Sequence, residues 1–325
     1  MSEYLGGTGL RVPEVCVGTY TLAGAWGGDL DAATAGLRHG LDRGLVFFDT
    51  AHAYGRAESA LGRVLAPELA GHRDEIVLCS KGGLDLRRRA GAATPFAPNS
   101  RPEFLRACLV DSLRRLGTDH VDVYLVHWFD PAVPIAETAG AMASFVKEGL
   151  ARHIGVSNYT VGQMAEFERS AALDVIQVPY SLFSRGAERE LLPYARERNL
   201  GVMGYAALAQ GYLSGTFTEE PSFSKRDFRR GASDFSGDVY TARVHAAKEM
   251  RAIAASLGCG LPELAMAWVR AGEQPVVPLV GIQAPEHVDS ILTAAELDLA
   301  PDVLARLRTI AASAPEMDFD ALVTS

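Results

Sequence analysis

The stretch Val46-Phe47-Phe48-Asp49-Thr50-Ala51-His52-Ala53-Tyr54-Gly55 decides how the rest of this chain is interpreted. It begins as an apolar run and ends in polar residues just before a segment typical of a helix, residues 56–65. This pattern is typical of a buried parallel strand that brings side chains to its C-terminal end. Two further predicted strands end in the same way, one before Lys81 and the other before His127. The sequence therefore places an acid, a phenol, an amine and an imidazole at neighbouring strand ends.

Segments typical of strands alternate with segments typical of helices along almost the whole chain. The predicted strands cover residues 15–19, 45–49, 76–80, 121–126, 152–156, 174–178, 201–205 and 276–280. The predicted helices cover residues 32–43, 56–66, 101–116, 136–148, 160–170, 187–198, 240–271 with a break near 258–262, 285–294 and 301–313. This alternation predicts an α/β fold, a (β/α)8 TIM barrel, as one domain over residues 1–325.

Three features of the barrel follow from local sequence. Glycines at residues 6–9 predict an N-terminal β-hairpin that closes the barrel bottom, and Asp31 is expected to cap the helix at 32–43. Three connections on the C-terminal face are long, at residues 82–100, 181–187 and 209–239. Long loops of this kind in a compact domain are usually functional, so they are predicted to form substrate and cofactor walls.

Composition narrows the class of partner. The chain has 325 residues, 48% hydrophobic residues and a formal net charge of −9. An acidic chain is a poor match for nucleic acid or an anionic membrane, so we expect a small-molecule partner. No apolar run approaches the roughly 20 residues that span a bilayer, and residues 1–11 lack the features of a signal peptide, so a cytoplasmic protein is expected. The four cysteines have neither C-x-x-C nor metal-ligand spacing, and no metal site is predicted.

The residues at the strand ends suit proton transfer to a carbonyl. A tyrosine near pKa 10 works near neutrality only if its phenolate is stabilised, and the ammonium of Lys81 can do this while Asp49 holds the lysine. His127 would orient a carbonyl oxygen by hydrogen bonding. We therefore predict Asp49, Tyr54, Lys81 and His127 as catalytic residues. Tyr54, His127, Trp26 and Trp128 are predicted to contact the substrate.

Six segments in order along the chain strengthen this interpretation. They are 48–55, Ser80-Lys81-Gly82, Asp122-Val123-Tyr124-Leu125-Val126-His127-Trp128, Gly155-Val156-Ser157-Asn158-Tyr159, Gln177-Val178-Pro179-Tyr180 and Gly201-Val202-Met203-Gly204-Tyr205. Together they resemble the aldo-keto reductase family over nearly the whole chain. The resemblance is closest to the bacterial branch that also contains potassium-channel β-subunits.

The resemblance implies an NADP(H)-dependent enzyme that reduces an aldehyde or ketone to an alcohol with Tyr54 as general acid. It implies a cofactor site without the glycine-rich Rossmann motif, and the chain has no such motif after a strand. The implied cofactor contacts are Gly18, Thr19, Tyr20, Asp49, Ser157, Asn158, Gln177, Tyr205, Ala206, Leu208, Gln210, Gly211, Leu213, Arg229, Gly281, Gln283 and His287. Within this set, Ser157, Asn158 and Gln177 would bind the nicotinamide carboxamide, and Tyr205 would stack on its ring.

The chain departs from the family pattern where the 2′-phosphate of NADPH would bind. Gln283 stands where a basic or hydroxyl residue is usual, and Ser290-Ile291 replace Glu-Asn. A phosphate is normally met by Arg or Lys, so NADH is an alternative to NADPH, unless His287 or an arginine of the segment 225–230, such as Arg229, supplies the contact.

Two other functions fit parts of the same pattern. The first is a nucleotide-sensing regulatory or partner subunit that keeps the barrel and the cofactor site. The second is a lyase or isomerase in which Lys81 forms a Schiff base, and a neighbouring Asp49 argues against it by keeping the amine protonated. The carbonyl substrate and the oligomeric state are left open by the sequence.

Overall fold

Eight parallel strands close into a barrel in the computed structural model, which describes residues 3–24, 29–86, 96–217, 223, 227, 229–230, 232–317 and 319. Around the barrel each strand pairs with the next barrel strand in the chain, and the last pairs with the first. The strands are β3 (Cys16–Gly18), β4 (Phe47–Asp49), β5 (Val77–Gly82), β8 (Val121–Val126), β9 (Ala151–Ser157), β10 (Val175–Pro179), β11 (Gly201–Tyr205) and β12 (Val277–Gly281). The predicted (β/α)8 TIM barrel is therefore confirmed.

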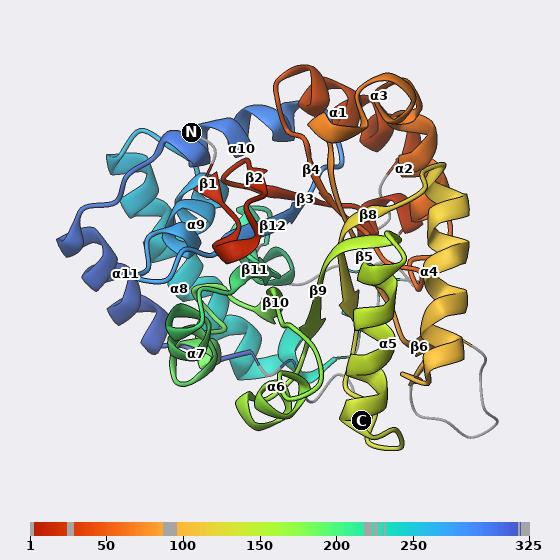
Figure 1. The fold of residues 1–325 in the computed structure, drawn as a ribbon. Helices are drawn as coiled ribbons and strands as arrows, with labels where there is room; N and C mark the ends of the chain where they lie inside the picture. The colour runs from red at the N-terminus through yellow and green to blue at the C-terminus, as the bar shows by residue number, and fades with distance from the viewer. Residues whose placement is uncertain are drawn as a thin grey trace.

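Helices surround the barrel and cover its outer face (Figure 1). They are α1 (Leu30–Asp42), α2 (Ala57–Val64), α3 (Ala66–Gly71), α4 (Pro102–Leu116), α5 (Ile135–Lys147), α6 (Val161–Phe167), α7 (Leu191–Glu197), α8 (Gly237–Ser256), α9 (Leu261–Arg270), α10 (Glu286–Glu296) and α11 (Pro301–Ala312). Among the residues that the structure describes, no single helix is long and apolar enough to cross a bilayer. The helices α8 and α9 pass that test only as a pair, and they meet at a bend of 89°.

Two predicted helices differ from the structure in detail. Asp31 lies in the first turn of α1, and Asp29 is the N-cap because its carboxylate accepts hydrogen bonds from the backbone N–H of Asp31 and Ala32. The predicted helix at 56–66 ends at Val64, and α3 follows with Pro67 in its first turn. A proline lacks the N–H that would continue the first helix and is favoured at the start of a new one.

The N-terminal hairpin closes one end of the barrel. Strands β1 (Glu3–Tyr4) and β2 (Arg11–Val12) pair antiparallel, and Leu5 and Val12 join the apolar cluster inside the barrel. The backbone of Gly7 donates to the carbonyl of Asn199, just before β11 begins. The hairpin therefore covers the N-terminal ends of the strands, as predicted, and leaves the C-terminal ends as the open mouth.

One connection at the mouth has structure that the sequence analysis did not predict. Residues 82–100 contain two short strands, β6 (Leu84–Asp85) and β7 (Ala97–Pro98). They pair antiparallel, and the segment 87–95 between them is outside the described residues. Strand β6 begins two residues after the end of β5, the strand that carries Lys81.

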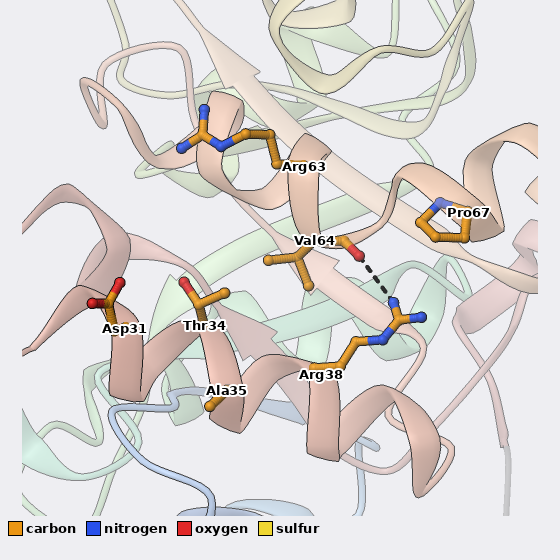
Figure 2. A pocket seen from close by; sticks show the side chains of 7 residues that line it. All are labelled: Asp31, Thr34, Ala35, Arg38, Arg63, Val64 and Pro67. Carbon is orange, nitrogen blue, oxygen red and sulfur yellow. Dashed lines mark hydrogen bonds between the residues drawn. The ribbon is translucent and has the colours of Figure 1, made fainter.

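A shallow groove opens between α1 and the segment from α2 to α3, on the outer helical layer (Figure 2). Its lining comes from Asp31, Thr34, Ala35, Arg38, Arg63, Val64 and Pro67. Arg38 crosses the groove and donates to the carbonyl of Val64 at 2.9 Å and to the carboxylate of Glu68. These contacts join α1 to both α2 and α3. The groups expected to carry the chemistry lie elsewhere, at the strand ends.

Candidate active site

The barrel brings the four predicted catalytic side chains together at its mouth. Asp49 ends β4, Lys81 lies near the end of β5, His127 follows β8, and Tyr54 stands in the turn after β4. The ammonium nitrogen of Lys81 is 2.6 Å from the Asp49 carboxylate, 2.9 Å from the carbonyl of Thr50 and 3.5 Å from the Tyr54 hydroxyl. The rings of Tyr54 and His127 meet edge to face with centroids 5.7 Å apart.

Lys81 is fully buried and remains charged. Burial by itself would lower the pKa of the amine. The carboxylate of Asp49, joined by smaller effects of Tyr54 and Cys79, more than offsets burial, so the pKa of Lys81 lies above its ordinary value. A protonated amine cannot attack a carbonyl to form a Schiff base, so this arrangement disfavours the lyase or isomerase alternative. The site instead holds one fixed positive charge beside a phenol.

The phenol of Tyr54 remains protonated at neutral pH. Burial raises the pKa of Tyr54, and the charge of Lys81 lowers it by less, so the balance lies above the ordinary value. The effect of the lysine alone predicts a lowered pKa for Tyr54, and the net direction differs because removal from water disfavours the phenolate. A protonated phenol next to a fixed ammonium is a proton donor whose conjugate base is stabilised as it forms.

His127 is neutral. Burial lowers the pKa of the imidazole well below its ordinary value, and the nearby charge of Lys81 lowers it further. Its Nδ1 atom is buried and has no hydrogen-bond partner within the described part of the chain. A neutral imidazole beside Tyr54 can donate a hydrogen bond to a substrate oxygen without competing as an acid.

The predicted nicotinamide contacts form one hydrogen-bonded network across the next three strands. The side-chain amide of Gln177 donates at 2.8 Å to Oδ1 of Asp49, the carboxylate oxygen that is not bonded to Lys81. Asn158, which has a left-handed φ of 60°, donates to the carbonyl of His127 and to the hydroxyl of Ser157, and it accepts from the Tyr205 hydroxyl at 2.9 Å. The catalytic set and the polar residues at the ends of β9, β10 and β11 are thus one connected site.

The segment after β11 has a backbone shaped for a close approach. Ala206, Ala209 and Gln210 have φ angles of 55°, 49° and 51°, and Gly211 follows at 111°. Non-glycine residues seldom adopt this conformation, and such strain is concentrated at ligand sites. The segment also includes the predicted contacts Leu208 and Leu213.

The predicted basic contact at this segment is already engaged. Arg229 donates to the carbonyl of Gln210 at 2.9 Å, pairs with Asp227 at 2.6 Å and lies over the Phe223 ring. The guanidinium of Arg229 therefore links Asp227 to the backbone of the segment after β11.

The residues after β12 lie beside the first barrel strand. Gly281 pairs with Gly18 in register, and the ring nitrogen Nδ1 of His287 accepts from the backbone N–H of Gln283 at 3.2 Å. Ile291 is 2% exposed and belongs to the apolar core, so it faces the barrel side of α10. The structure therefore gives this segment no charged group aimed at a phosphate among the predicted contacts.

The predicted contacts on β3 and in the substrate set are placed as follows. Thr19 is buried and donates to the carbonyl of Asp49, while the exposed ring of Tyr20 packs on Tyr54 with centroids 4.9 Å apart. Trp128 follows His127 and is partly buried. Trp26 lies outside the described residues. Within the described part of the chain, no group of three or more His, Cys, Asp or Glu side chains is arranged to hold a metal ion.

The structure adds neighbours that the sequence did not indicate. Phe319, from the C-terminal segment, packs edge to face on Tyr205 with centroids 5.5 Å apart. Glu58 of α2 and Arg115 of α4 meet beneath the loop that carries Tyr54. Neither contact had a local signal, because each joins residues that are far apart in the chain.

Comparison with known proteins agrees with this geometry. Residues 14–312 match the model of the Aldo/keto reductase family. The aldo-keto reductase YhdN of Bacillus subtilis is 33% identical over 289 residues, covering 87% of this chain and 85% of the relative. The NADH-specific methylglyoxal reductase of Escherichia coli is 29% identical, covering 91% and 94%.

A solved structure has the same fold over nearly the whole chain. The glycerol dehydrogenase AKR11B4 from Gluconobacter oxydans superposes with a TM-score of 0.86 at 29% identity, covering 98% of this chain and 97% of that one. The family match and this superposition both extend over the catalytic strands. The chain therefore belongs to the aldo/keto reductase family, a family of oxidoreductases.

Proposed function

We propose that the protein reduces an aldehyde or ketone to an alcohol with a nicotinamide cofactor and with Tyr54 as general acid. The observation that carries this proposal is that Tyr54 lies at the mouth of the barrel with the charged amine of Lys81 3.5 Å from its hydroxyl. The neutral ring of His127, 5.7 Å from the Tyr54 ring between centroids, supports the same function. The bound cofactor would supply the hydride, which is the chemistry that side chains lack.

The residues of this chain would then handle the oxygen and its proton. Tyr54 donates its proton to the carbonyl oxygen, and Lys81 stabilises the developing phenolate. Asp49 holds the ammonium in place through the 2.6 Å contact. His127 donates a hydrogen bond to the same oxygen and orients the carbonyl. In the reverse reaction, the phenolate of Tyr54 accepts the proton of the alcohol.

The nicotinamide would be held by the amide and hydroxyl groups of Ser157, Asn158 and Gln177 and by the ring of Tyr205. The left-handed segment from Ala206 to Leu213 would hold the pyrophosphate through its backbone. Two relatives named for methylglyoxal reduction and glycerol dehydrogenation act on three-carbon compounds, and they make small polar carbonyls the first substrates to test.

Replacing Tyr54 with Phe tests the proposal. The variant keeps the ring but loses the proton donor, so we expect reduction to fall by about 10² to 10⁴-fold. Cofactor affinity, measured by quenching of tryptophan fluorescence, should stay close to that of the wild type. Unchanged turnover in Y54F would rule out Tyr54 as the general acid. Cofactor binding by the wild type without reduction of any carbonyl would instead favour a nucleotide-binding partner subunit.

Cofactor choice is a second expected outcome, and our starting proposal is NADPH with NADH as the alternative. Gln283 is uncharged, His287 faces the Gln283 backbone and Arg229 is paired with Asp227. Because these three predicted contacts offer no guanidinium to the 2′-phosphate, we expect the two cofactors to bind within about tenfold of one another, which is ~1.4 kcal/mol. Fluorescence titrations with both cofactors measure this ratio, and Q283R should shift it toward NADPH. A strong NADPH preference in the wild type would mean that another group meets the phosphate.

A further inference from the structure

The loop that carries Tyr54 has no regular structure of its own. Residues 50–56 connect β4 to α2, and on one side they are held by the backbone of β5. The N–H of Thr50 donates to the carbonyl of Cys79, and the N–H of His52 donates to the carbonyl of Lys81 at 3.0 Å. These bonds fix the start of the loop, but Tyr54 lies two residues beyond the last of them.

An ion pair between a partly exposed arginine and a buried glutamate holds the other side of the loop. Arg115 donates to the carbonyl of His52 at 3.1 Å, and the same guanidinium nitrogen is 3.3 Å from the carboxylate of Glu58. Glu58 is completely buried, and its second oxygen accepts from the hydroxyl of Ser80 at 2.8 Å. Ser80 is the residue before Lys81. The ion pair therefore touches both the loop of Tyr54 and the strand of Lys81.

These contacts close a ring of interactions around the reacting pair. Starting from Lys81, the ring passes through Ser80, Glu58, Arg115 and the carbonyl of His52, and it returns through the loop to Tyr54. We propose that Glu58 and Arg115 are positioning residues that set the distance between the Tyr54 hydroxyl and the Lys81 ammonium. They touch neither the substrate nor the cofactor site, and they act through Ser80 and His52.

A further carboxylate, that of Asp111, also holds the guanidinium of Arg115. Asp111, one turn earlier on α4, accepts from the second guanidinium nitrogen of Arg115 at 2.5 Å, so the guanidinium has acceptors on three sides. The Nε2 atom of His52 is 3.3 Å from the same carboxylate. An arginine with a planar fork fits several acceptors at fixed angles, which a flexible lysine does not reproduce.

The inference rests on the proposed role of Tyr54 and predicts an effect of a particular kind. The charged and titratable groups that face Tyr54 are Lys81 on β5, Asp49 on β4, Tyr20 after β3 and His127 after β8. Lys81 is the group that favours the phenolate, so a looser loop weakens that effect and raises the pKa of Tyr54. Alcohol oxidation needs the phenolate, and its rate should then rise only at higher pH.

The experiment compares R115M and E58Q with the matched control R114M in the full-length protein. Arg114 is the next residue on the same helix and contacts the same Asp111, but its side chain is 72% exposed and the structure gives it no contact with Glu58 or His52. We expect R115M and E58Q to lower kcat by about 10 to 100-fold, since small misplacements of catalytic groups cost this much. The pH profile of oxidation should move upward, the KM for cofactor should stay unchanged, and R114M should behave like the wild type.

Two more variants keep the test decisive if a single substitution impairs folding. The double variant E58Q/R115M removes both charges, so it avoids an unpaired buried charge but still lacks the donor to His52. It should show the same shifted pH profile, and R115K should recover part of the lost kcat. A wild-type kcat and pH profile in R115M or in the folded double variant would overturn the inference. Y54F separates the two proposals. Normal turnover in Y54F would remove the proposed role of Tyr54 as general acid, whereas an inactive Y54F beside a normal R115M would remove only the positioning role of Glu58 and Arg115.

Discussion

Lys81 and His127 are both buried beside Tyr54, yet Lys81 is charged and His127 is neutral. Burial lowers the pKa of each. For Lys81 the carboxylate of Asp49 at 2.6 Å, with smaller effects of Tyr54 and Cys79, reverses the shift, whereas no carboxylate is among the groups that shift the pKa of His127. The charge of Lys81 even adds to the shift of His127. One carboxylate therefore sets which neighbour of the phenol is a cation and which is a neutral donor.

The lowered pKa of His127 predicts how stability depends on pH. Below its ordinary pKa of about 6.5 the histidine takes up a proton in the unfolded chain but not in the folded one, so stability falls as the pH falls. Between pH 7.5 and pH 5 this single group should cost the wild type up to about 2 kcal/mol of unfolding free energy.

Urea unfolding of the wild type and of H127F at both pH values measures this contribution. The variant has no titrating ring at this position, so it should lose less stability on acidification than the wild type. Equal losses in the two proteins would contradict a neutral buried His127. Lys81 does not confuse the comparison, because its raised pKa affects stability only at alkaline pH, above its unfolded value of about 10.4.

At the scale of elements, the loop of Tyr54 depends on how closely α2 approaches α4. Gly62 of α2 faces the end of α4, and a Cβ atom there would lie 2.5 Å from the carbonyl oxygen of Leu116. The absence of a side chain lets the two helices meet, and this contact brings Glu58 within 3.3 Å of Arg115. Gly62 and the ion pair of Glu58 with Arg115 therefore belong to the same interface between α2 and α4.

Replacing Gly62 with Ala should separate these helices. A backbone oxygen cannot move aside as a flexible side chain can, so we expect a loss of about 1–3 kcal/mol in stability. G140A is the matched control, since Gly140 lies in α5 with nothing within 4 Å of its added Cβ, and alanine there should stabilise the protein by about 0.5–1 kcal/mol. Thermal unfolding of both variants checks the two opposite signs. A gain in stability for G62A would mean that the helix contact adapts at no cost.

At the scale of the whole molecule, one end of the barrel is closed by apolar packing and the other carries the candidate active site. The N-terminal hairpin closes the bottom with Leu5 and Val12 inside the barrel, while Asp49, Lys81 and His127 lie at the mouth. Binding residues concentrated at the C-terminal ends of the strands are the rule for this fold. Stability and chemistry should therefore be separable by substitution at opposite ends.

Leu5 provides a test of this separation. The side chain is 2% exposed, so L5A should lower the unfolding free energy by about 2–5 kcal/mol. The kcat of the folded fraction should be unchanged, because the mouth is not touched. Y4A is the control, since Tyr4 is 63% exposed and should matter little. A lower kcat in folded L5A would show that the two ends are coupled.

Much of this architecture could be predicted from the chain alone because its causes are local. Apolar runs ending in polar residues indicated the strands, and in a parallel barrel all such ends share one face. This is why Asp49, Tyr54, Lys81 and His127 could be grouped before their distances were known. The position of the first helix cap was wrong by two residues, since both Asp29 and Asp31 are acceptable caps and only the backbone conformation chooses between them.

The periodicity and the strand ends in the sequence by themselves determined the barrel, its catalytic face and the residue types that meet there. The tertiary structure alone decided that Gln177 donates to Asp49, that Glu58 reaches Arg115 and that Tyr54 keeps a raised pKa beside a lysine. The physical reason is that pattern and propensity act over a few neighbouring residues. Hydrogen bonds and desolvation depend on distances between residues 57 and 128 positions apart, and closure of the barrel sets those distances.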